Sequence, residues 1–463
     1  MFTNNDTKAI KGAAVIMMLF HHLACFSDRF PVGFKGFESV WDGFITDGYL
    51  SALATNVRIC VAVFFFLGGY GLYKRYEAGK FSLMDSILSL FKKYWKVFIV
   101  FIPIAYIFFA RTGSDINFLA TKYNFENGKE LISKLLANFA ALDNSLNGEW
   151  WFIQSYICAL IAGTVFCTAT KKNKSFAVDL FLVFIVDILI RNVFPAIANS
   201  ETFSVLNFDF YYVRFFKMTS TASAFFAGIV FAKHDGIVRI KNVLSEIPGK
   251  PIIGLLGCLA VLWSRSFIMG DSLDLVYSFM FVAFLSVFLD GIKPLKTGLG
   301  FIGVHSTNIW LIHSFYCYNF LEVTKIVYST SSVWIDLLIL LAMSLVSSII
   351  LEFVFKKLGY IISLIKSKTS AAQPAAAMAV SSGAVMAVPV TESEEDSADE
   401  PETSPEDTAD MAAITAAYES FTSSEDEPDE AFIYESITEP LSEQPEAVPA
   451  QPLPKEENNE ISI

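Results

Sequence analysis

The chain has 463 residues, of which 54% are hydrophobic and 15% aromatic, and its mean hydropathy is +0.48. These values exclude a soluble globular protein, because the surface of a folded domain grows too fast with size for so much apolar area to be buried. The net charge of −13 is unevenly distributed: residues 371–463 carry a net −22, and the first 370 residues carry +9. The composition therefore predicts a membrane-embedded part followed by an acidic tail.

Ten apolar stretches approach the length of about 20 residues that a helix needs to cross a bilayer, although the sixth is short and could begin upstream near Tyr211. In chain order they are residues 10–26, 57–73, 94–110, 150–170, 176–194, 220–233, 251–269, 273–290, 299–320 and 333–355. We therefore predict an all-α fold, a polytopic bundle of about ten transmembrane helices. Residues 1–368 form its membrane domain, and the lipid bilayer is its first partner.

Lysine and arginine are enriched beside membrane spans on the cytoplasmic side. With the N-terminus inside, the cytoplasmic loops and flanks hold 21 basic residues, and the opposite loops and flanks hold 12. An even number of spans puts both termini on the same side. We therefore expect a multi-pass protein of the cell membrane with both termini in the cytoplasm.

Residues 369–463 are rich in Ala, Pro, Ser, Thr and Glu. They contain too few large apolar residues to offset the entropy of an ordered chain. This segment is predicted to be a disordered cytoplasmic tail that affects abundance or partners rather than chemistry.

The first span contains two adjacent histidines, His21 and His22, and an ionisable residue inside a membrane is a functional candidate. Lys11 precedes His22 by eleven residues, about 1100° of helical rotation, so both lie on one face about 16 Å apart along the axis. A cation at the cytoplasmic end and a deep imidazole suit a long ligand with an anionic head. His21 points about 100° away, and we expect it to hydrogen-bond a neighbouring helix.

The second span ends in LGGYGLYKR, which places Lys74 and Arg75 at the cytoplasmic surface. They either anchor the helix by the positive-inside rule or bind phosphates, for which a guanidinium is geometrically suited. The fourth span begins with Glu149 and two tryptophans, Trp150 and Trp151, which are typical of an aromatic belt. Glu149 could bind an acceptor hydroxyl, orient a histidine or cap the helix.

The ninth span contains His305 and His313 and begins on the same side as the first. His313 therefore lies at a depth comparable to that of His22. The two could form a proton relay, a metal pair or a catalytic site, or each could be satisfied separately by a neighbouring helix. No third His or Cys lies at helical spacing, so we expect no metal site.

These motifs, in this order, resemble the acyltransferase-3 family of integral-membrane acyltransferases, common in bacteria. The resemblance runs from about Lys8 to Gly359 and rests on the Lys11–His22 spacing, LGGYGLYKR, EWWFIQ and GVHSTNIWLIH. Two departures are Gly68, where the family often has Ser, and Lys11, where Arg is commoner. Some relatives carry an extra esterase-like domain, whereas this chain carries the acidic tail.

The resemblance implies an enzyme that transfers an acyl group, often acetyl, from cytoplasmic acyl-CoA to a hydroxyl of a cell-surface glycan, lipid or similar acceptor. His22 would be the catalytic histidine, acting as a general base or carrying the acyl group covalently. His313 and Glu149 are further catalytic candidates, and Lys11, Lys74 and Arg75 are candidates for binding the donor. Acyl-CoA is then a substrate rather than a resident cofactor, and no nucleic-acid partner is expected.

Two other functions remain open at the level of sequence. One is a transporter or flippase in which His22 and His313 relay protons, which broken helices and inverted repeats would support. We find glycine clusters but no repeat. The other is a non-catalytic sensor or scaffold that signals through the tail.

Overall fold

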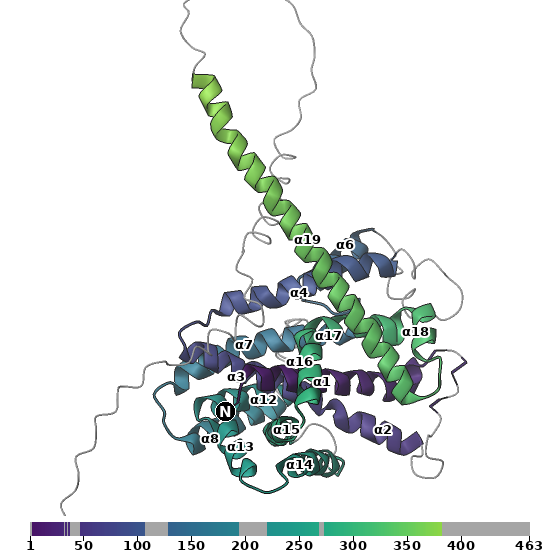
Figure 1. Ribbon diagram of the computed structural model, residues 1–463, viewed down its shortest axis with the longest axis vertical. Coiled ribbons are helices and arrows are strands. Elements are labelled where there is room, and N and C mark those ends of the chain that lie inside the picture. The colour runs from purple at the N-terminus through teal and green to yellow at the C-terminus, as the bar shows by residue number, and fades with distance from the viewer. Residues whose placement is uncertain are drawn as a thin grey trace, which may run out of the picture. The chain divides into compact units, whose positions relative to one another are not determined.

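A computed structural model describes residues 2–31, 33–34, 36–37, 47–106, 128–193, 220–267 and 273–381. Within these residues every regular element is a helix, which confirms the all-α prediction for this part of the chain (Figure 1). They belong to the first of two compact units, Met1–Glu427. Residues 382–463 of the predicted tail, and residues 107–110, 194 and 268–269 of the predicted spans, lie outside the described residues.

Each predicted span corresponds to helical structure. These helices are α1 (Asn4–Ala24), α3 (Cys60–Glu77), α4 (Leu83–Ile104), α7 (Trp151–Thr170), α8 (Phe176–Ile188), α12 (Ser223–Lys233), α14 (Lys250–Arg265), α15 (Asp274–Asp290), α16 (Lys293–Val304) with α17 (Ser306–Ser314), and α19 (Val333–Ser381). Shorter helices lie between them: α2 (Asp47–Asn56), α6 (Gly128–Phe139), α13 (Gly236–Ser245) and α18 (Leu321–Val327).

Three helical stretches of the described chain are long and apolar enough to cross a membrane: Leu50–Glu77, Gly148–Thr170 and Val333–Ile365. Ser223–Lys233 is apolar but shorter. These helices support a membrane protein, and the number of ten spans stays a prediction.

Two elements differ from the sequence-based expectation. The ninth span is not one helix, because α16 ends at Val304 and α17 begins at Ser306, with His305 at the junction. The last helix, α19, continues past residue 369, where we expected the tail to begin, and ends at Ser381. Alanines dominate the added stretch, and alanine has the highest intrinsic helix propensity.

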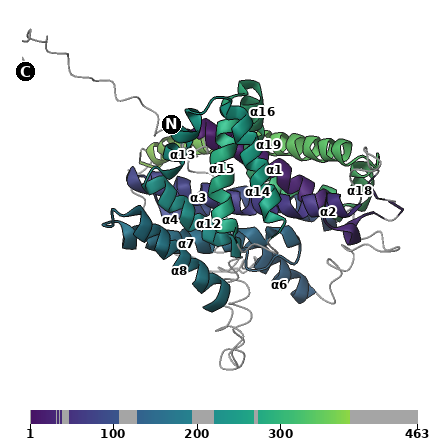
Figure 2. The ribbon, with the colours of Figure 1, turned by 90° about the horizontal axis from the view of Figure 1, so that it is seen from below.

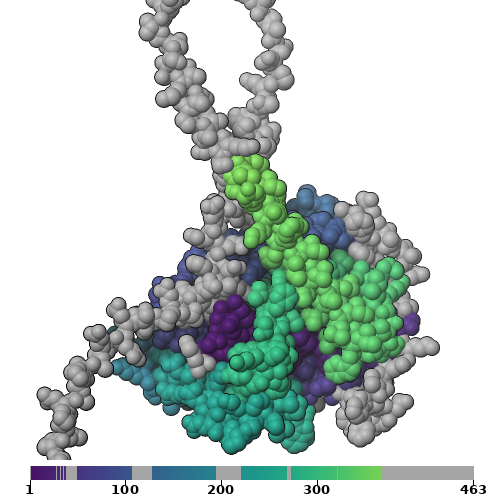
Figure 3. Space-filling view, viewed as in Figure 1, coloured from purple at the N-terminus to yellow at the C-terminus, as the bar shows by residue number. Residues whose placement is uncertain are grey.

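Helix α1 lies inside the bundle and contacts α3, α15, α16, α17 and α19 (Figures 1 and 2). Its contact with α16 is especially close, since a Cβ on Gly12 would lie 1.9 Å from the carbonyl oxygen of Leu299. A Cβ on Gly303 would likewise lie 1.9 Å from the carbonyl oxygen of Lys8. Only glycine at both positions permits this backbone approach. In the space-filling view the purple beginning of the chain lies against the green segment around residue 300 (Figure 3).

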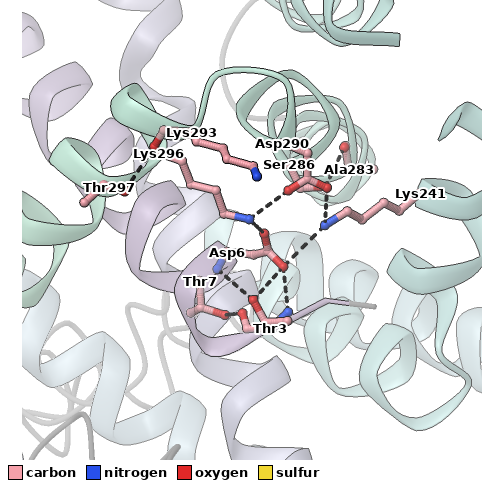
Figure 4. Close-up of polar contacts among 10 residues, drawn as sticks. All are labelled: Thr3, Asp6, Thr7, Lys241, Ala283, Ser286, Asp290, Lys293, Lys296 and Thr297. Atoms are coloured by element: carbon pink, nitrogen blue, oxygen red, sulfur yellow. Dashed lines mark hydrogen bonds and ion pairs between the residues drawn. The ribbon is translucent and has the colours of Figure 1, made fainter. Parts of the chain in front are cut away.

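A closed ring of four ion pairs anchors the beginning of α1 (Figure 4). Asp6 contacts both Lys241 (3.3 Å) and Lys296, and Asp290 contacts the same two lysines at 2.8 and 2.7 Å. Asp6 also closes a capping box with Thr3, whose backbone N–H donates to the carboxylate at 2.7 Å. We call Asp6, Lys241, Asp290 and Lys296 the ion-pair ring.

Burial raises the pKa of the Asp6 carboxyl, but the hydrogen bonds from Lys296 and Thr3 and the charge of Lys241 outweigh it. The pKa of Asp6 therefore lies below its ordinary value of 3.8. The carboxylate stays charged at neutral pH, and the ring joins α1 to α13, α15 and α16.

Candidate active site

Helix α1 contacts both α16 and α17, which brings two of the predicted histidines together. Asp6 near the start of α1 pairs with Lys296 near the start of α16. From the close approach at Gly12 and Gly303, His22 and His313 each lie ten residues further along the chain. Their ring centroids are 4.8 Å apart. This contact brings the two histidines into one cluster, and their depth in a membrane stays a prediction.

The third predicted residue, Glu149, joins them from another part of the chain. It lies in a single helical turn, Gly148–Trp150, immediately before α7, where Asn147 caps its backbone N–H at 3.2 Å. Its Oε2 atom lies 3.3 Å from His22 Nε2, and the side chains of both residues are 11% exposed. Of the roles left open for Glu149, contact with a histidine is the one that the geometry supports.

Hydrogen bonds from the residues on either side of Glu149 join its turn to α17. Asn147 donates a hydrogen bond to Ser314 Oγ at 2.7 Å, and the indole N–H of Trp150 donates to the carbonyl oxygen of Leu311 at 3.1 Å. Trp150 is only 2% exposed and packs edge-on against Tyr94. An aromatic belt at the membrane surface is therefore the wrong interpretation of Trp150, which instead supports the site from within the core.

Two further residues complete the cluster, and sequence reasoning missed both. Arg29 Nη1 donates to Glu149 Oε1 at 3.0 Å, and the hydroxyl of Tyr318 donates to the same oxygen at 2.6 Å. We call His22, Glu149, His313, Arg29 and Tyr318 the histidine cluster.

A change in helical winding places Tyr318 in the cluster. Residues five apart in an α-helix point about 140° away from each other, so Tyr318 would not share a face with His313. After Ser314 the chain forms a π-helical segment, Phe315–Asn319, closed by a hydrogen bond from Phe320 N–H to the Phe315 carbonyl oxygen at 2.7 Å. The wider turn bonds residues five apart and rotates Tyr318 back toward the site. The ring of Tyr318 lies 6.4 Å from that of His22.

A weak sequence signal existed for Arg29 and none for Tyr318. Arg29 follows His22 by seven residues, which is close to two full helical turns. Helix α1, however, ends at Ala24, and Arg29 lies in a separate turn, Ser27–Arg29. For Tyr318, helical spacing predicts the wrong face.

Each histidine of the pair presents one buried nitrogen without a hydrogen-bond partner among the described residues. These atoms are His22 Nδ1 and His313 Nε2. The other nitrogen of His313, Nδ1, lies 2.6 Å from the carbonyl oxygen of Trp310. A carbonyl only accepts, so the hydrogen bond assigns the His313 proton to Nδ1 and a lone pair to Nε2. The carboxylate of Glu149, 3.3 Å from His22 Nε2, likewise favours the proton of His22 on Nε2 and a lone pair on Nδ1.

The neighbouring histidine has a structural role. His21 is 6% exposed, and its Nδ1 lies 2.7 Å from the carbonyl oxygen of Ala54 in α2. This contact confirms the prediction that His21 bonds a neighbouring helix. His305, at the junction of α16 and α17, lies 2.9 Å from Ser348 Oγ of α19.

The three predicted donor-binding cations lie elsewhere. Lys74 and Arg75 occupy the last turn of α3, where Lys74 pairs with Glu77 (3.1 Å) and Asp235 (3.4 Å) and Arg75 donates to Ser86 Oγ at 3.2 Å. Phe2 packs against Tyr70, so this turn lies beside the beginning of α1.

Lys11 lies in α1 between the ion-pair ring and His22 and is partly buried. The structure therefore does not bring these cations into the histidine cluster. It arranges them toward the opposite end of α1.

Among the described residues, no group of three or more His, Cys, Asp or Glu side chains is arranged to hold a metal ion. The cluster has the parts of an acid–base site: a carboxylate, an imidazole 3.3 Å from it, and a second imidazole beside the first.

A family model for the acyltransferase-3 family, described as an acyltransferase domain, matches residues 5–353. The match covers more than half of the chain, and His22, Glu149 and His313 all fall within it. Comparison with curated proteins and with solved structures finds no match.

Proposed function

Because this chain belongs to the acyltransferase-3 family, we propose that it moves an acyl group, acetyl in the first instance, from acyl-CoA to a hydroxyl of a cell-surface glycan or lipid-linked acceptor. The family membership makes the chain an acyltransferase. The donor, the acceptor and the residues that act belong to the proposal.

The contact between His22 and Glu149 carries the proposal. A buried imidazole that faces a carboxylate with one nitrogen and is open at the other has the arrangement of a general base. The open atom is His22 Nδ1, which is buried and has no hydrogen-bond partner among the described residues. An unpaired buried acceptor costs about 1–3 kcal/mol, which a bound hydroxyl would recover.

The reaction follows from these atoms. His22 Nδ1 takes the proton of the acceptor hydroxyl as its oxygen attacks the thioester carbonyl carbon. The C–S bond then breaks, an ester forms, and CoA leaves as a thiolate that receives the proton from the imidazolium of His22. In the covalent alternative, Nδ1 itself attacks the thioester, the C–S bond breaks and CoA leaves as a thiolate. The acceptor hydroxyl then attacks the acyl group on Nδ1, its proton passes to the thiolate, and the C–N bond breaks to restore His22.

His313 is the second catalytic candidate. Its ring lies 4.8 Å from that of His22, and the lone pair assigned to Nε2 can receive a proton. We propose that it exchanges a proton with His22 or with the leaving thiolate during the transfer.

The donor is proposed to enter from the cytoplasm of a bacterial cell. A ten-span topology with both termini inside would put the beginning of α1, with Lys74 and Arg75 beside it, on the cytoplasmic side. These two residues and Lys11 would bind the phosphates, and the pantetheine arm would extend along α1 toward His22. The acceptor would arrive from the other side of the membrane, where Arg29 and Glu149 lie.

One observation favours the alternative of a transporter. The junction at His305 breaks the ninth predicted span, and broken helices are common in carriers. The family membership and the carboxylate–histidine contact favour the acyltransferase.

The test is acyl transfer by the purified full-length protein in liposomes, with radiolabelled acetyl-CoA and membrane extract as acceptor. Wild type is expected to release CoA and label the extract, and His22→Gln is expected to lose at least about 10³-fold in rate. Glu149→Gln keeps the shape but not the charge, and we expect about a 10²-fold loss.

His305→Gln is the matched control, because this histidine lies outside the cluster, and it should remain active. A folded wild-type protein with no CoA release would contradict acetyl transfer. Uptake of a solute into those same liposomes, coupled to the movement of protons, would instead support the alternative that the protein is a transporter.

A further inference from the structure

The two oxygens of the Glu149 carboxylate are used differently. Oε1 accepts hydrogen bonds from Arg29 at 3.0 Å and from Tyr318 at 2.6 Å, whereas Oε2 faces His22 Nε2 at 3.3 Å. Hydrogen bonds to a charged group are roughly twice as strong as neutral ones. The carboxylate therefore cannot turn to another partner without losing two strong contacts, and its free oxygen stays directed at the imidazole.

The fixed carboxylate determines which nitrogen of His22 is open. A carboxylate only accepts hydrogen bonds, so its contact with Nε2 keeps the ring proton there and the lone pair on Nδ1. If Glu149 could rotate, the neutral imidazole would also adopt the second tautomer. In that form Nδ1 carries the proton and cannot act as a base.

Arg29 is itself held firmly. Its guanidinium lies over the rings of Phe26 (4.1 Å) and Tyr318 (4.9 Å), so Tyr318 both bonds Glu149 and supports Arg29. The side chain of Arg29 is 33% exposed, compared with 11% for those of Glu149 and His22. Arg29 is thus the more exposed neighbour of the nearly buried pair Glu149 and His22. In a variant without this side chain, a small cation can reach the position of the guanidinium.

We propose that Arg29 and Tyr318 are positioning residues that act through Glu149 to keep Nδ1 of His22 as the open base. The inference deepens the proposed acyl transfer and rests on it. Neither side chain needs to touch a substrate for this role, so their loss should reduce turnover and leave donor binding nearly unchanged.

The kinetic test compares Tyr318→Phe with Tyr316→Phe. The two tyrosines lie in the same π-helical segment and each forms a hydroxyl hydrogen bond of 2.6 Å, to Glu149 and to Ser347 respectively. We expect Tyr318→Phe to lower kcat by about 10- to 100-fold, with the KM for acetyl-CoA within about twofold of wild type. Tyr316→Phe should keep the wild-type kcat. Equal kcat values for wild type and Tyr318→Phe would overturn the inference.

A second kinetic test uses Arg29→Ala. We expect a similar loss of kcat and partial restoration by millimolar guanidinium ion, which can occupy the space of the missing side chain. Guanidinium should not restore His22→Gln, whose missing base it cannot replace. A loss in Arg29→Ala that neither guanidinium nor the conservative Arg29→Lys variant recovers would point to a structural role and contradict the inference.

A spectroscopic test does not depend on turnover. The chain has five histidines, so nitrogen NMR of ¹⁵N-histidine-labelled protein in liposomes can assign His22 by its loss in His22→Gln. Wild type and Tyr316→Phe should show the tautomer with the proton on Nε2, and Tyr318→Phe and Arg29→Ala should show a mixture. An unchanged single tautomer in both variants would overturn the inference. Failure of acyl transfer in wild type with a mixed tautomer in the variants would overturn only the proposed function.

Discussion

The two ends of α1 carry two polar clusters that differ in how completely their buried polar groups are paired. In the ion-pair ring, Asp6 and Asp290 each contact both Lys241 and Lys296. In the histidine cluster, His22 and His313 lie 4.8 Å apart, and each has a nitrogen without a hydrogen-bond partner among the described residues.

The difference separates a structural cluster from a functional one. A buried polar group is normally paired, because leaving it unpaired costs about 1–3 kcal/mol. The ring meets this rule and fixes the position of α1. The histidine cluster violates it at two atoms, which is expected where a substrate supplies the missing partner. Breaking the ring should therefore affect mainly stability, whereas changes in the histidine cluster should affect mainly activity.

After the loss already expected for His22→Gln, the largest effect in this comparison is expected from His313→Gln. The glutamine removes the open Nε2 base but retains a polar group of similar size, so we expect acyl transfer to fall by about 10²-fold. The thermal unfolding of the purified protein should change little, because Nε2 has no hydrogen-bond partner among the described residues and the glutamine amide can donate to the Trp310 carbonyl oxygen in place of Nδ1. Unchanged activity with a large loss of stability would place His313 with the structural histidines such as His21.

The next effect tests the register that brings the histidines together. Gly303→Ala would put a Cβ against the backbone of Lys8, so α1 and α16 must separate, and overpacking of this kind costs about 1–3 kcal/mol. We expect a lower melting temperature and reduced acyl transfer, since the distance between His22 and His313 depends on this contact.

Gly300→Ala is the matched control on the same helix, because a Cβ there meets no atom within 4 Å. It should keep activity and leave stability unchanged or raise it by about 0.4–1 kcal/mol. Equal behaviour of the two alanine variants would show that the close approach does not set the register.

The smallest effect on acyl transfer is expected from Asp6→Asn, which opens the ion-pair ring. We expect a loss of stability of about 1–3 kcal/mol, because Asp6 and Lys241 are buried, although Asp290 still contacts both lysines. Activity should stay within about twofold of wild type. Thermal unfolding in detergent and the acyl-transfer assay would measure the two quantities.

The pH dependence of this loss has a defined sign. The pKa of Asp6 is below 3.8 in the folded protein, so its contribution to stability is complete above that value and disappears as the pH falls through the lowered pKa. The difference in stability between wild type and Asp6→Asn should thus be constant from about pH 5 to 8 and shrink below about pH 4. A difference that grows as the pH falls would contradict the role given to the ring.

The sequence by itself determined that the predicted spans are helical, though not the shorter helices between them, and it placed Lys11 and His22 on one helix and His313 on another. These features are local, because the length and apolar character of a helix and its period of 3.6 residues can be read along a single segment. The family also followed from short motifs in order, and the match over residues 5–353 agrees with it.

Only the tertiary structure decided that Glu149 lies beside His22, that Trp150 is buried, and that Arg29 and Tyr318 complete the cluster. Each of these contacts joins segments far apart in the chain, and helical periodicity does not specify which faces of different helices meet. The break at His305 and the π-helical segment at Phe315–Asn319 also depart from regular winding. Packing against neighbouring helices, rather than local propensity, determines where such departures occur, and here they bring Tyr318 to the carboxylate.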